Sequence, residues 1–166
     1  MDKRKTLITG SFDPPTRGHE DIIRRLCETF DEVRAVAFIN AQKAGFFPPE
    51  YRLSLLRQVC APFPNAHADA AEGYVADYVL REGIDLIVRG VRGEEDIAYE
   101  MQMADFNRKA AGVETFFVNA LPGFEHFSSS EVRRRLLSGE DVRALLPEVI
   151  TEEIMQNWQK NRISPR

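Results

Sequence analysis

Hydrophobic positions fall into two alternating patterns along the chain. Short apolar or β-branched runs, which predict strands, occupy residues 5–9, 33–39, 66–68, 84–88 and 115–118. Segments with apolar residues at helical spacing follow them, at residues 21–27, 49–59, 74–81, 96–110, 130–138 and 148–162. Because strands alternate with helices, we predict βαβ crossovers. The predicted fold class is α/β, a single-domain Rossmann-like, doubly wound five-stranded parallel sheet with helices on both faces.

The size of the chain fits one domain over residues 1–166, with a C-terminal helix at about 148–162 that packs on it or lies in an interface. The sequence contains no run of about 18 apolar residues, so we expect no membrane partner. The net charge of −4 argues against a nucleic-acid-binding surface. Cys27 and Cys60 match no metal or redox spacing, so we interpret them as free thiols in the cytoplasm.

One stretch joins the first strand to the first helix: Thr-Gly-Ser-Phe-Asp-Pro-Pro-Thr-Arg-Gly-His at residues 9–19. A helix start carries unpaired N–H groups and a partial positive charge, so it attracts phosphate. His19 follows Thr16 by three residues, so both side chains can face the same point. The stretch lacks the signatures of a Walker loop and of a dinucleotide loop. We interpret it as another kind of phosphate site; the alternative is a proline-rich loop with a solvated histidine.

The residues after the other strands are also chemically unusual. Lys43 follows the second strand, Tyr74 the third, Arg-Gly-Val-Arg at 89–92 the fourth, and three serines at 128–130 the fifth. In a parallel α/β sheet, ligands bind at the carboxyl ends of the strands. We therefore expect these segments and the first loop to converge on one edge of the sheet.

Each of these segments also has an ordinary structural explanation. The guanidinium forks of Arg89 and Arg92 suit phosphate oxygens, but both are also explained as solvated loop arginines. Ser128 and Glu131 form a capping box, which starts a helix and also makes an anion site. Lys43 is either a surface lysine or a cation that reduces repulsion between two phosphates.

Further interpretations concern the helices and the loop after the fifth strand. Glu100 is either an acceptor for a ribose hydroxyl or a solvated glutamate, and Met103 and Phe106 on the same helix are expected in the core. The arginines at 133–135 are expected to gather anions. Trp158 on the last helix indicates either packing or an interface.

Taken together, these stretches resemble two nested groups of enzymes. The Thr-x-Gly-His element at 16–19 is similar to that of the nucleotidyltransferases whose fold is shared with class I aminoacyl-tRNA synthetases. With Lys43, Arg-Gly-Val-Arg at 89–92, Tyr-Glu-Met-Gln at 99–102 and Ser-Ser-Ser-Glu-Val at 128–132, the chain resembles the phosphopantetheine adenylyltransferase family. The first element gives the reaction type, whereas Arg-Gly-x-Arg followed by Tyr-Glu-x-Gln selects the family.

The resemblance implies adenylyl transfer from ATP to 4′-phosphopantetheine by direct in-line attack, giving dephospho-coenzyme A and pyrophosphate. It implies Mg²⁺ as cofactor, carried on the ATP phosphates without protein ligands, and a homohexamer. Its catalytic residues are His19, Lys43 and Ser11. Its ATP-binding residues are Ser11, Phe12, His19, Gly90, Val91, Arg92, Glu100, Phe124, Glu125, His126, Phe127, Ser128, Ser129 and Ser130. Its acceptor-binding residues are Ser11, Lys43, Tyr74, Val75 and Arg89.

Some positions depart from the family pattern. The loop after the second strand has one lysine, Lys43, where the family has two, and Tyr74 and Val75 stand where small apolar residues commonly line the acceptor arm. These departures concern the contacts to the pantetheine arm and not the chemistry. Two alternatives to the family's activity also stay open. One is a sister nucleotidyltransferase that acts on nicotinate mononucleotide or on glycerol or choline phosphate. The other is a nucleotide-binding sensor that has kept the fold without turnover.

Overall fold

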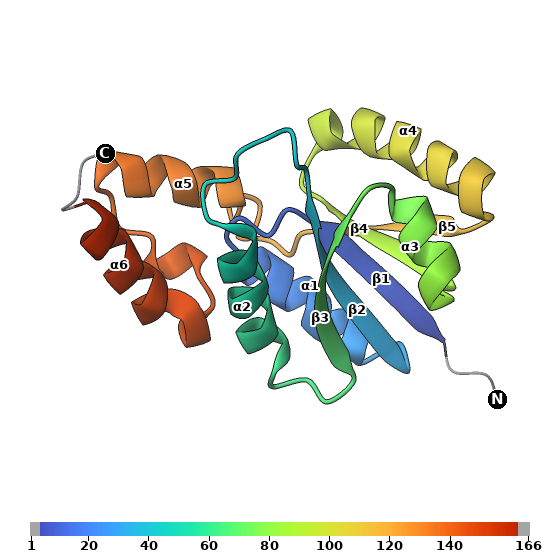
Figure 1. Cartoon of the computed structure of the whole chain (residues 1–166), viewed down its shortest axis with the longest axis horizontal. Coiled ribbons are helices and arrows are strands. Elements are labelled where there is room, and N and C mark those ends of the chain that lie inside the picture. The colour runs from blue at the N-terminus through green and yellow to red at the C-terminus, as the bar shows by residue number, and fades with distance from the viewer. Residues whose placement is uncertain (1–3, 163–166) are drawn as a thin grey trace.

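The computed structural model describes residues 4–162, without the side chains of residues 95, 96 and 162. Its strands are β1 (Lys5–Gly10), β2 (Glu32–Ile39), β3 (Ala66–Glu72), β4 (Leu86–Val91) and β5 (Glu114–Asn119). Its helices are α1 (Arg17–Cys27), α2 (Pro49–Cys60), α3 (Val75–Glu82), α4 (Glu94–Ala111), α5 (Ser129–Ser138) and α6 (Glu148–Arg162), with a short 3₁₀ turn at Arg143–Leu145. The strands form one parallel sheet in the order β3-β2-β1-β4-β5 (Figure 1), so the predicted fold class is confirmed.

Alternate residues of the strands build two separate cores. Ile8 and Val88 belong to a cluster that includes side chains of α1, α2, α5 and α6. Their neighbours Leu7 and Ile87 point to the opposite face and pack with Tyr78 of α3. Because successive strand side chains point to opposite faces, a sheet with helices on both sides needs an apolar residue at nearly every strand position.

The sheet opens between its central strands. β1 pairs with β4 only as far as Ile8 opposite Val88. β4 continues to pair with β5 up to Val91 opposite Asn119. This is the point where the strand order reverses, and it leaves a crevice at the carboxyl edge, the usual ligand site of such sheets.

The expected end of the fourth strand was wrong. Arg89 and Gly90 lie within β4, opposite Phe117 and Val118 of β5, so only Arg92 follows the strand. The apolar run ends at Val88, but backbone pairing with β5 continues past it because hydrogen bonds of a ladder do not depend on side-chain polarity.

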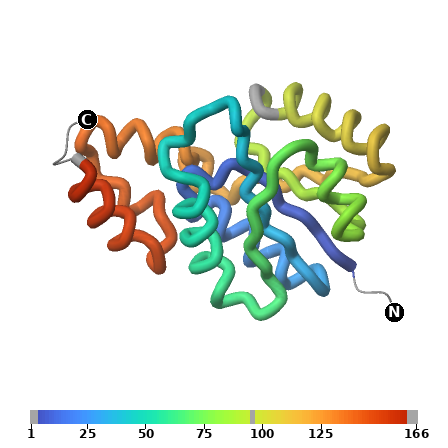
Figure 2. Tube along the Cα trace, in the orientation of Figure 1, coloured from blue at the N-terminus to red at the C-terminus, as the bar shows by residue number. Residues whose placement is uncertain are grey.

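The expectation that Met103 and Phe106 lie in the core was also wrong. Their side chains are 39% and 44% exposed. Tyr99 and Met101 of α4 and Phe116 of β5 are more than half exposed as well. β5 is an edge strand and α4 lies near that edge (Figure 2), so no further element of the described chain covers their apolar side chains.

The C-terminal helix packs on the domain. Ile150 and Ile154 of α6 are fully buried, and α6 lies against α2. The indole ring of Trp158 stacks on the ring of Phe46, with centroids 5.2 Å apart. In the described chain this helix thus packs on the domain, and a role in an interface stays a prediction. Among residues 4–162, no helix combines the length and the apolar character needed to cross a bilayer.

Candidate active site

A pocket of about 270 Å³ opens at the carboxyl edge where β1 and β4 separate, and we call it the serine pocket. The first loop, the start of α1, the end of β4, α4 and the segment from β5 into α5 all contribute to its wall. The predicted ATP-site residues that line it are Ser11, His19, Gly90, Val91, Arg92, Glu100, Phe124, Phe127, Ser128, Ser129 and Ser130. The structure thus brings together the segments that the sequence places after strands one, four and five.

Three predicted ATP-site residues lie outside this wall. Phe12 is fully buried, with its ring centroid 4.8 Å from that of His19, so it supports the histidine from the core side. Its φ angle of 44° falls in the left-handed region, which costs energy for a bulky residue. Glu125 and His126 are exposed and do not line the serine pocket.

His19 is held in one orientation at the start of α1. Its Nδ1 accepts a hydrogen bond from the backbone N–H of Thr16 at 3.0 Å. The Thr16 hydroxyl lies 3.1 Å from the same nitrogen and donates its proton to the carbonyl of Phe127. These contacts assign the imidazole proton to Nε2, on the opposite side of the ring.

The environment of His19 keeps its imidazole neutral. Burial, followed by the positive charges of Arg89 and Arg92, lowers the pKa of His19 to about 4. At neutral pH the ring therefore offers one N–H donor to the serine pocket and carries no charge. A donor of this kind suits a phosphate oxygen and does not require proton transfer.

Arg89 and Glu100 form a two-pronged ion pair beside His19. Arg89 Nε donates to Glu100 Oε2 at 2.8 Å, and Nη2 donates to Oε1 at 2.6 Å. Nη1 of Arg89 donates to both the carbonyl and the hydroxyl of Thr9. From the family resemblance we expected Arg89 to bind the acceptor and Glu100 to bind ATP. In the structure the two side chains form an ion pair with each other.

A second cavity of about 370 Å³ adjoins the first on the α3–α4 side of the sheet, and we call it the aromatic pocket. Tyr74 and Val75, predicted to bind the acceptor, both line it. The ring centroids of Tyr74 and Phe106 are 5.6 Å apart. Further apolar side chains of the wall are those of Phe38, Ile87, Tyr99, Met103 and Ala104. The residues that line both pockets are Thr9, Gly10, Ser11, Arg89 and Glu100.

Lys43 stands apart from both pockets. It lies in the segment at 40–48 that joins β2 to α2, and its side chain is exposed. Asn40 shapes this segment, since its carbonyl accepts from the N–H of Lys43 and its side chain accepts from the N–H of Gln42. Lys43 lines neither pocket, so the structure does not bring it together with His19.

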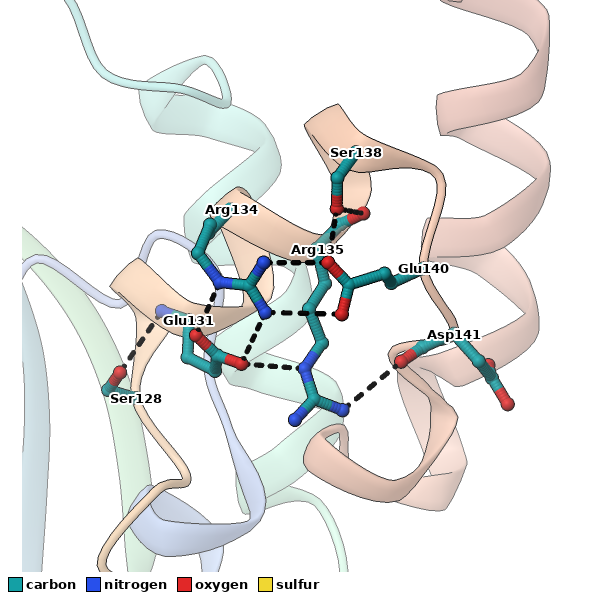
Figure 3. Close-up of polar contacts among 7 residues, drawn as sticks. All are labelled: Ser128, Glu131, Arg134, Arg135, Ser138, Glu140 and Asp141. Carbon is teal, nitrogen blue, oxygen red and sulfur yellow. Dashed lines mark hydrogen bonds and ion pairs between the residues drawn. The ribbon is translucent and has the colours of Figure 1, made fainter.

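The serine segment starts α5 with half of the predicted capping box. Ser128 Oγ accepts from the Glu131 N–H at 3.1 Å. The Glu131 carboxylate pairs instead with Arg134 and Arg135 (Figure 3). Hydrogen bonds from these two arginines lower the pKa of Glu131 to about 2. The expectation that residues 133–135 gather anions is therefore wrong for two of the three, because their guanidinium groups are occupied by acidic side chains.

The third arginine faces the serine pocket and joins it to the first loop. Arg133 donates to the carbonyl of Asp13 at 2.7 Å and to Ser130 Oγ at 3.0 Å. Ser129 Oγ donates to the carbonyl of Pro14 at 2.8 Å. At Gly18 a Cβ atom would lie 3.1 Å from the Phe127 carbonyl, so the close approach of the two segments favours glycine there.

No local pattern in the sequence indicates these contacts. Thr16 and Phe127 are 111 residues apart, and Asp13 and Arg133 are 120 apart. Hydrophobic periodicity reports which face of an element is buried, not which loops meet. Only the rule that strand ends share an edge indicated that these segments converge.

The wall of the serine pocket is suited to anions. Among the side chains that the structure describes, which exclude those of residues 95 and 96, no group of three or more His, Cys, Asp or Glu is placed to hold a metal ion. The charged and polar groups that face the cavity are mainly hydroxyls, Arg89, Arg92, Arg133 and the neutral His19. This donor set fits phosphate oxygens. The expectation that Mg²⁺ binds to those phosphates and not to protein side chains remains a prediction.

Comparisons with known proteins agree with this fold. A crystal structure from Vibrio parahaemolyticus, of a protein described as a candidate nicotinate-nucleotide adenylyltransferase, has a TM-score of 0.66 and 16% identity, covering 95% of this chain and 94% of that one. The lipopolysaccharide core biosynthesis protein of Thermoplasma volcanium GSS1 has a TM-score of 0.53 and 19% identity, covering 72% of this chain and 98% of that one. At these identities the likeness shows the fold alone.

The family assignment comes from the sequence profile. The profile described as Cytidylyltransferase-like matches residues 7–135, which include most of β1, all of β2 to β5, the first loop and the serine segment. The matched range thus contains nearly all of the wall of the serine pocket. This chain belongs to the Cytidylyltransferase-like family and is a nucleotidyltransferase.

Proposed function

We propose that this protein transfers the adenylyl group of ATP to the phosphate of 4′-phosphopantetheine, releasing pyrophosphate and dephospho-coenzyme A. The observation that carries the proposal is the junction of two unlike pockets at Ser11, Arg89 and Glu100. The serine pocket has the phosphate donors, and the aromatic pocket has apolar walls that suit a thin, partly apolar arm. A phosphate at the junction would lie within reach of both.

The chemistry needs little from the protein beyond position and charge. An oxygen of the acceptor phosphate forms a bond to the α-phosphorus of ATP, and the bond from that phosphorus to the bridging oxygen breaks. Pyrophosphate leaves with the electron pair. A phosphate ester is already a nucleophile at neutral pH, so no general base is required.

His19 acts on the group that is transferred. Its Nε2–H donates to a non-bridging oxygen of the α-phosphate, and the positive end of the α1 dipole favours the same negative charge. This donor is worth most where negative charge grows in the transition state. Mg²⁺, when bound to the ATP phosphates, would neutralise charge that these residues do not reach.

Arg89 can serve the acceptor while it stays paired with Glu100. A guanidinium has five N–H donors, and Arg89 makes four hydrogen bonds, to Glu100 and Thr9. The fifth donor remains for the acceptor phosphate. Lys43 would add its charge from the 40–48 segment, and Ser11 would contact both substrates.

The alternative acceptor is nicotinate mononucleotide. The Tyr74–Phe106 ring pair is the specific observation that favours it, because such a pair could stack on a pyridine ring. The Vibrio parahaemolyticus protein of the same fold is described with that activity. We favour phosphopantetheine because Tyr-Glu-Met-Gln at 99–102 follows Arg-Gly-Val-Arg at 89–92.

We also propose a homohexamer that works in the cytoplasm. The exposed apolar side chains of α4 and β5, among them Tyr99, Met101 and Phe116, support self-association, because a surface of this kind usually marks an interface. Cys27 and Cys60 are both free thiols, as a reducing compartment would keep them.

Pyrophosphate release from ATP tests the function against its alternatives. The acceptor panel is 4′-phosphopantetheine, nicotinate mononucleotide, glycerol 3-phosphate and phosphocholine, each with ATP and with CTP. The proposal predicts release with ATP and 4′-phosphopantetheine. A preference for nicotinate mononucleotide would select the sister activity, and ATP binding without release for any acceptor would favour the sensor.

A further inference from the structure

The segment that carries Lys43 is tied to the domain at its far end. Both carboxylate oxygens of Asp13 accept backbone hydrogen bonds from it: Oδ2 from the N–H of Phe46 at 2.7 Å and Oδ1 from the N–H of Phe47 at 2.8 Å. Asp13 is 5% exposed, so these bonds are shielded from water. The carboxylate therefore fixes the backbone three residues after Lys43.

Three further contacts hold this region and the neighbouring first loop. The ring of Phe46 stacks on Trp158 of α6, and Phe47 is buried against Tyr51 of α2. Arg52, also buried, donates from Nη1 to the carbonyl of Ser11 at 3.1 Å. Figure 1 shows the connection from β2 to α2 passing beyond the carboxyl edge of the sheet before it reaches these anchors.

The anchor is also packed closely around Gly45. A Cβ atom there would lie 3.0 Å from the Phe47 carbonyl and 3.2 Å from both Asp13 Oδ2 and Arg52 Nη2. A side chain at this position would require these neighbours to move by a few tenths of an ångström, so glycine fits best between Lys43 and the anchored pair. Asn40 closes the other side of the segment with a compact turn.

We propose that Asp13 and Trp158 are positioning residues, which act through Phe46 and Phe47 to limit where the 40–48 segment can place Lys43 relative to the junction of the two pockets. Asp13 lies two residues after Ser11, which lines both pockets, so the anchor ties the Lys43 segment to the junction itself. The inference rests on the proposed function, in which Lys43 contributes charge between donor and acceptor.

Asp13→Asn is the first test, because an amide keeps the shape and replaces one acceptor with a donor that faces an N–H. We expect kcat to fall about tenfold, as for the loss of one such hydrogen bond, with KM for ATP unchanged. In a Lys43→Ala background the same substitution should cost nothing further, since no lysine remains to be positioned. Asp85→Asn is the control, because Asp85 accepts a backbone N–H at the amino end of β4.

Trp158→Leu is the second test, and it does not depend on the folding of an Asp13 variant. Loss of the stacked ring should lower kcat about threefold, again only while Lys43 is present. Ile150→Val on the same helix is its control and should leave kcat unchanged.

Hydrogen exchange supplies a readout that is independent of turnover. The amides of Phe46 and Phe47 should exchange faster in Asp13→Asn than in the wild type, and those of β1 should not. Unchanged exchange at these two amides would overturn the anchor. So would an Asp13→Asn loss that persists in Lys43→Ala, or a Lys43→Ala variant with full turnover. A wild type that adenylylates no acceptor would contradict the proposed function, while exchange would still decide whether Asp13 holds the segment.

Discussion

Arg89 of β4 and Glu100 of α4 share two hydrogen bonds, of 2.8 Å and 2.6 Å, at the boundary between the serine pocket and the aromatic pocket. Both side chains are largely buried, with 26% and 10% of their surface exposed. Because both side chains line both pockets, a ligand in either pocket can contact this pair. Substitution of either residue by an uncharged one would leave the charge of the other without its ion-pair partner.

Arg89→Ala should raise the KM for 4′-phosphopantetheine about tenfold or more, because one charge-assisted contact is worth about 1.5–3 kcal/mol. ATP affinity should change less. Steady-state kinetics with each substrate varied in turn, beside calorimetric ATP titration, measures both. Glu100→Gln keeps the shape of the partner and serves as the comparison. An Arg89→Ala enzyme that loses ATP affinity and keeps acceptor affinity would reverse the assignment.

His19→Ala should fold normally and lose turnover by a factor of about 100 to 1,000, the usual cost of one transition-state donor. His19→Gln, which retains an N–H donor, should recover part of the loss. Circular dichroism confirms the fold of each variant before the rate is measured. Near-normal turnover in well-folded His19→Ala would remove the histidine from the mechanism.

The lowered pKa of His19 also predicts a pH dependence of stability. The unfolded state binds a proton near pH 6.5 and the folded state only near pH 4, so the unfolded state holds more protons between these values. His19 therefore costs no stability at neutral pH and an increasing amount as the pH falls through that window, about 2 kcal/mol at about pH 5. Urea unfolding of wild type and His19→Gln at both pH values measures the difference between the two proteins. The stability of the wild type relative to His19→Gln should fall by about 2 kcal/mol from neutral pH to about pH 5. An equal difference at both pH values would contradict the neutral imidazole.

Thr16→Val should lower the free energy of unfolding by about 1–3 kcal/mol, because the buried carbonyl of Phe127 loses its donor. ATP binding should weaken with it, since the same hydroxyl joins the first loop to the serine segment. Thr16→Ser keeps the hydroxyl and is the matched control. Full ATP affinity in Thr16→Val would show that this bond does not shape the serine pocket.

Native mass spectrometry at about micromolar protein tests the homohexamer, in the range where specific oligomers persist. Met101→Glu places a charge on the exposed apolar face of α4 and should dissociate the assembly. Val149→Glu, an equally drastic change at an exposed position of α6, should leave it intact. A monomeric wild type would remove self-association from the account.

The strand and helix order could be predicted from the sequence because most strands are apolar runs bounded by loops that carry polar residues, glycine or proline. The exception is β3, whose sequence alternates alanine with charged and polar residues, so only its first residues were predicted. The convergence of the first loop, Arg92 and the serines on one edge followed from the parallel sheet alone. The Arg89–Glu100 pair could not be predicted, since it depends on the angle at which α4 crosses the end of β4. The prediction that Met103 and Phe106 lie in the core failed for a related reason. Helical spacing identifies an apolar face of a helix but does not show whether another element packs on it.

Asp13 shows a second limit of sequence analysis. In the sequence it stands in a loop beside Pro14, where it is typical of a turn residue. Its carboxylate instead serves two amides 33 and 34 residues further along the chain. Contacts of this kind come from three-dimensional loop packing, which no local pattern encodes.

The most direct test of the central claim follows the phosphorus atoms of ATP. Wild-type protein with Mg²⁺ and 4′-phosphopantetheine is given ATP labelled with ³²P at either the α or the γ position, and the products are separated. Adenylyl transfer predicts the α label in dephospho-coenzyme A and the γ label in pyrophosphate. The γ label in the acceptor, or the α label transferred only when nicotinate mononucleotide replaces 4′-phosphopantetheine, would contradict it.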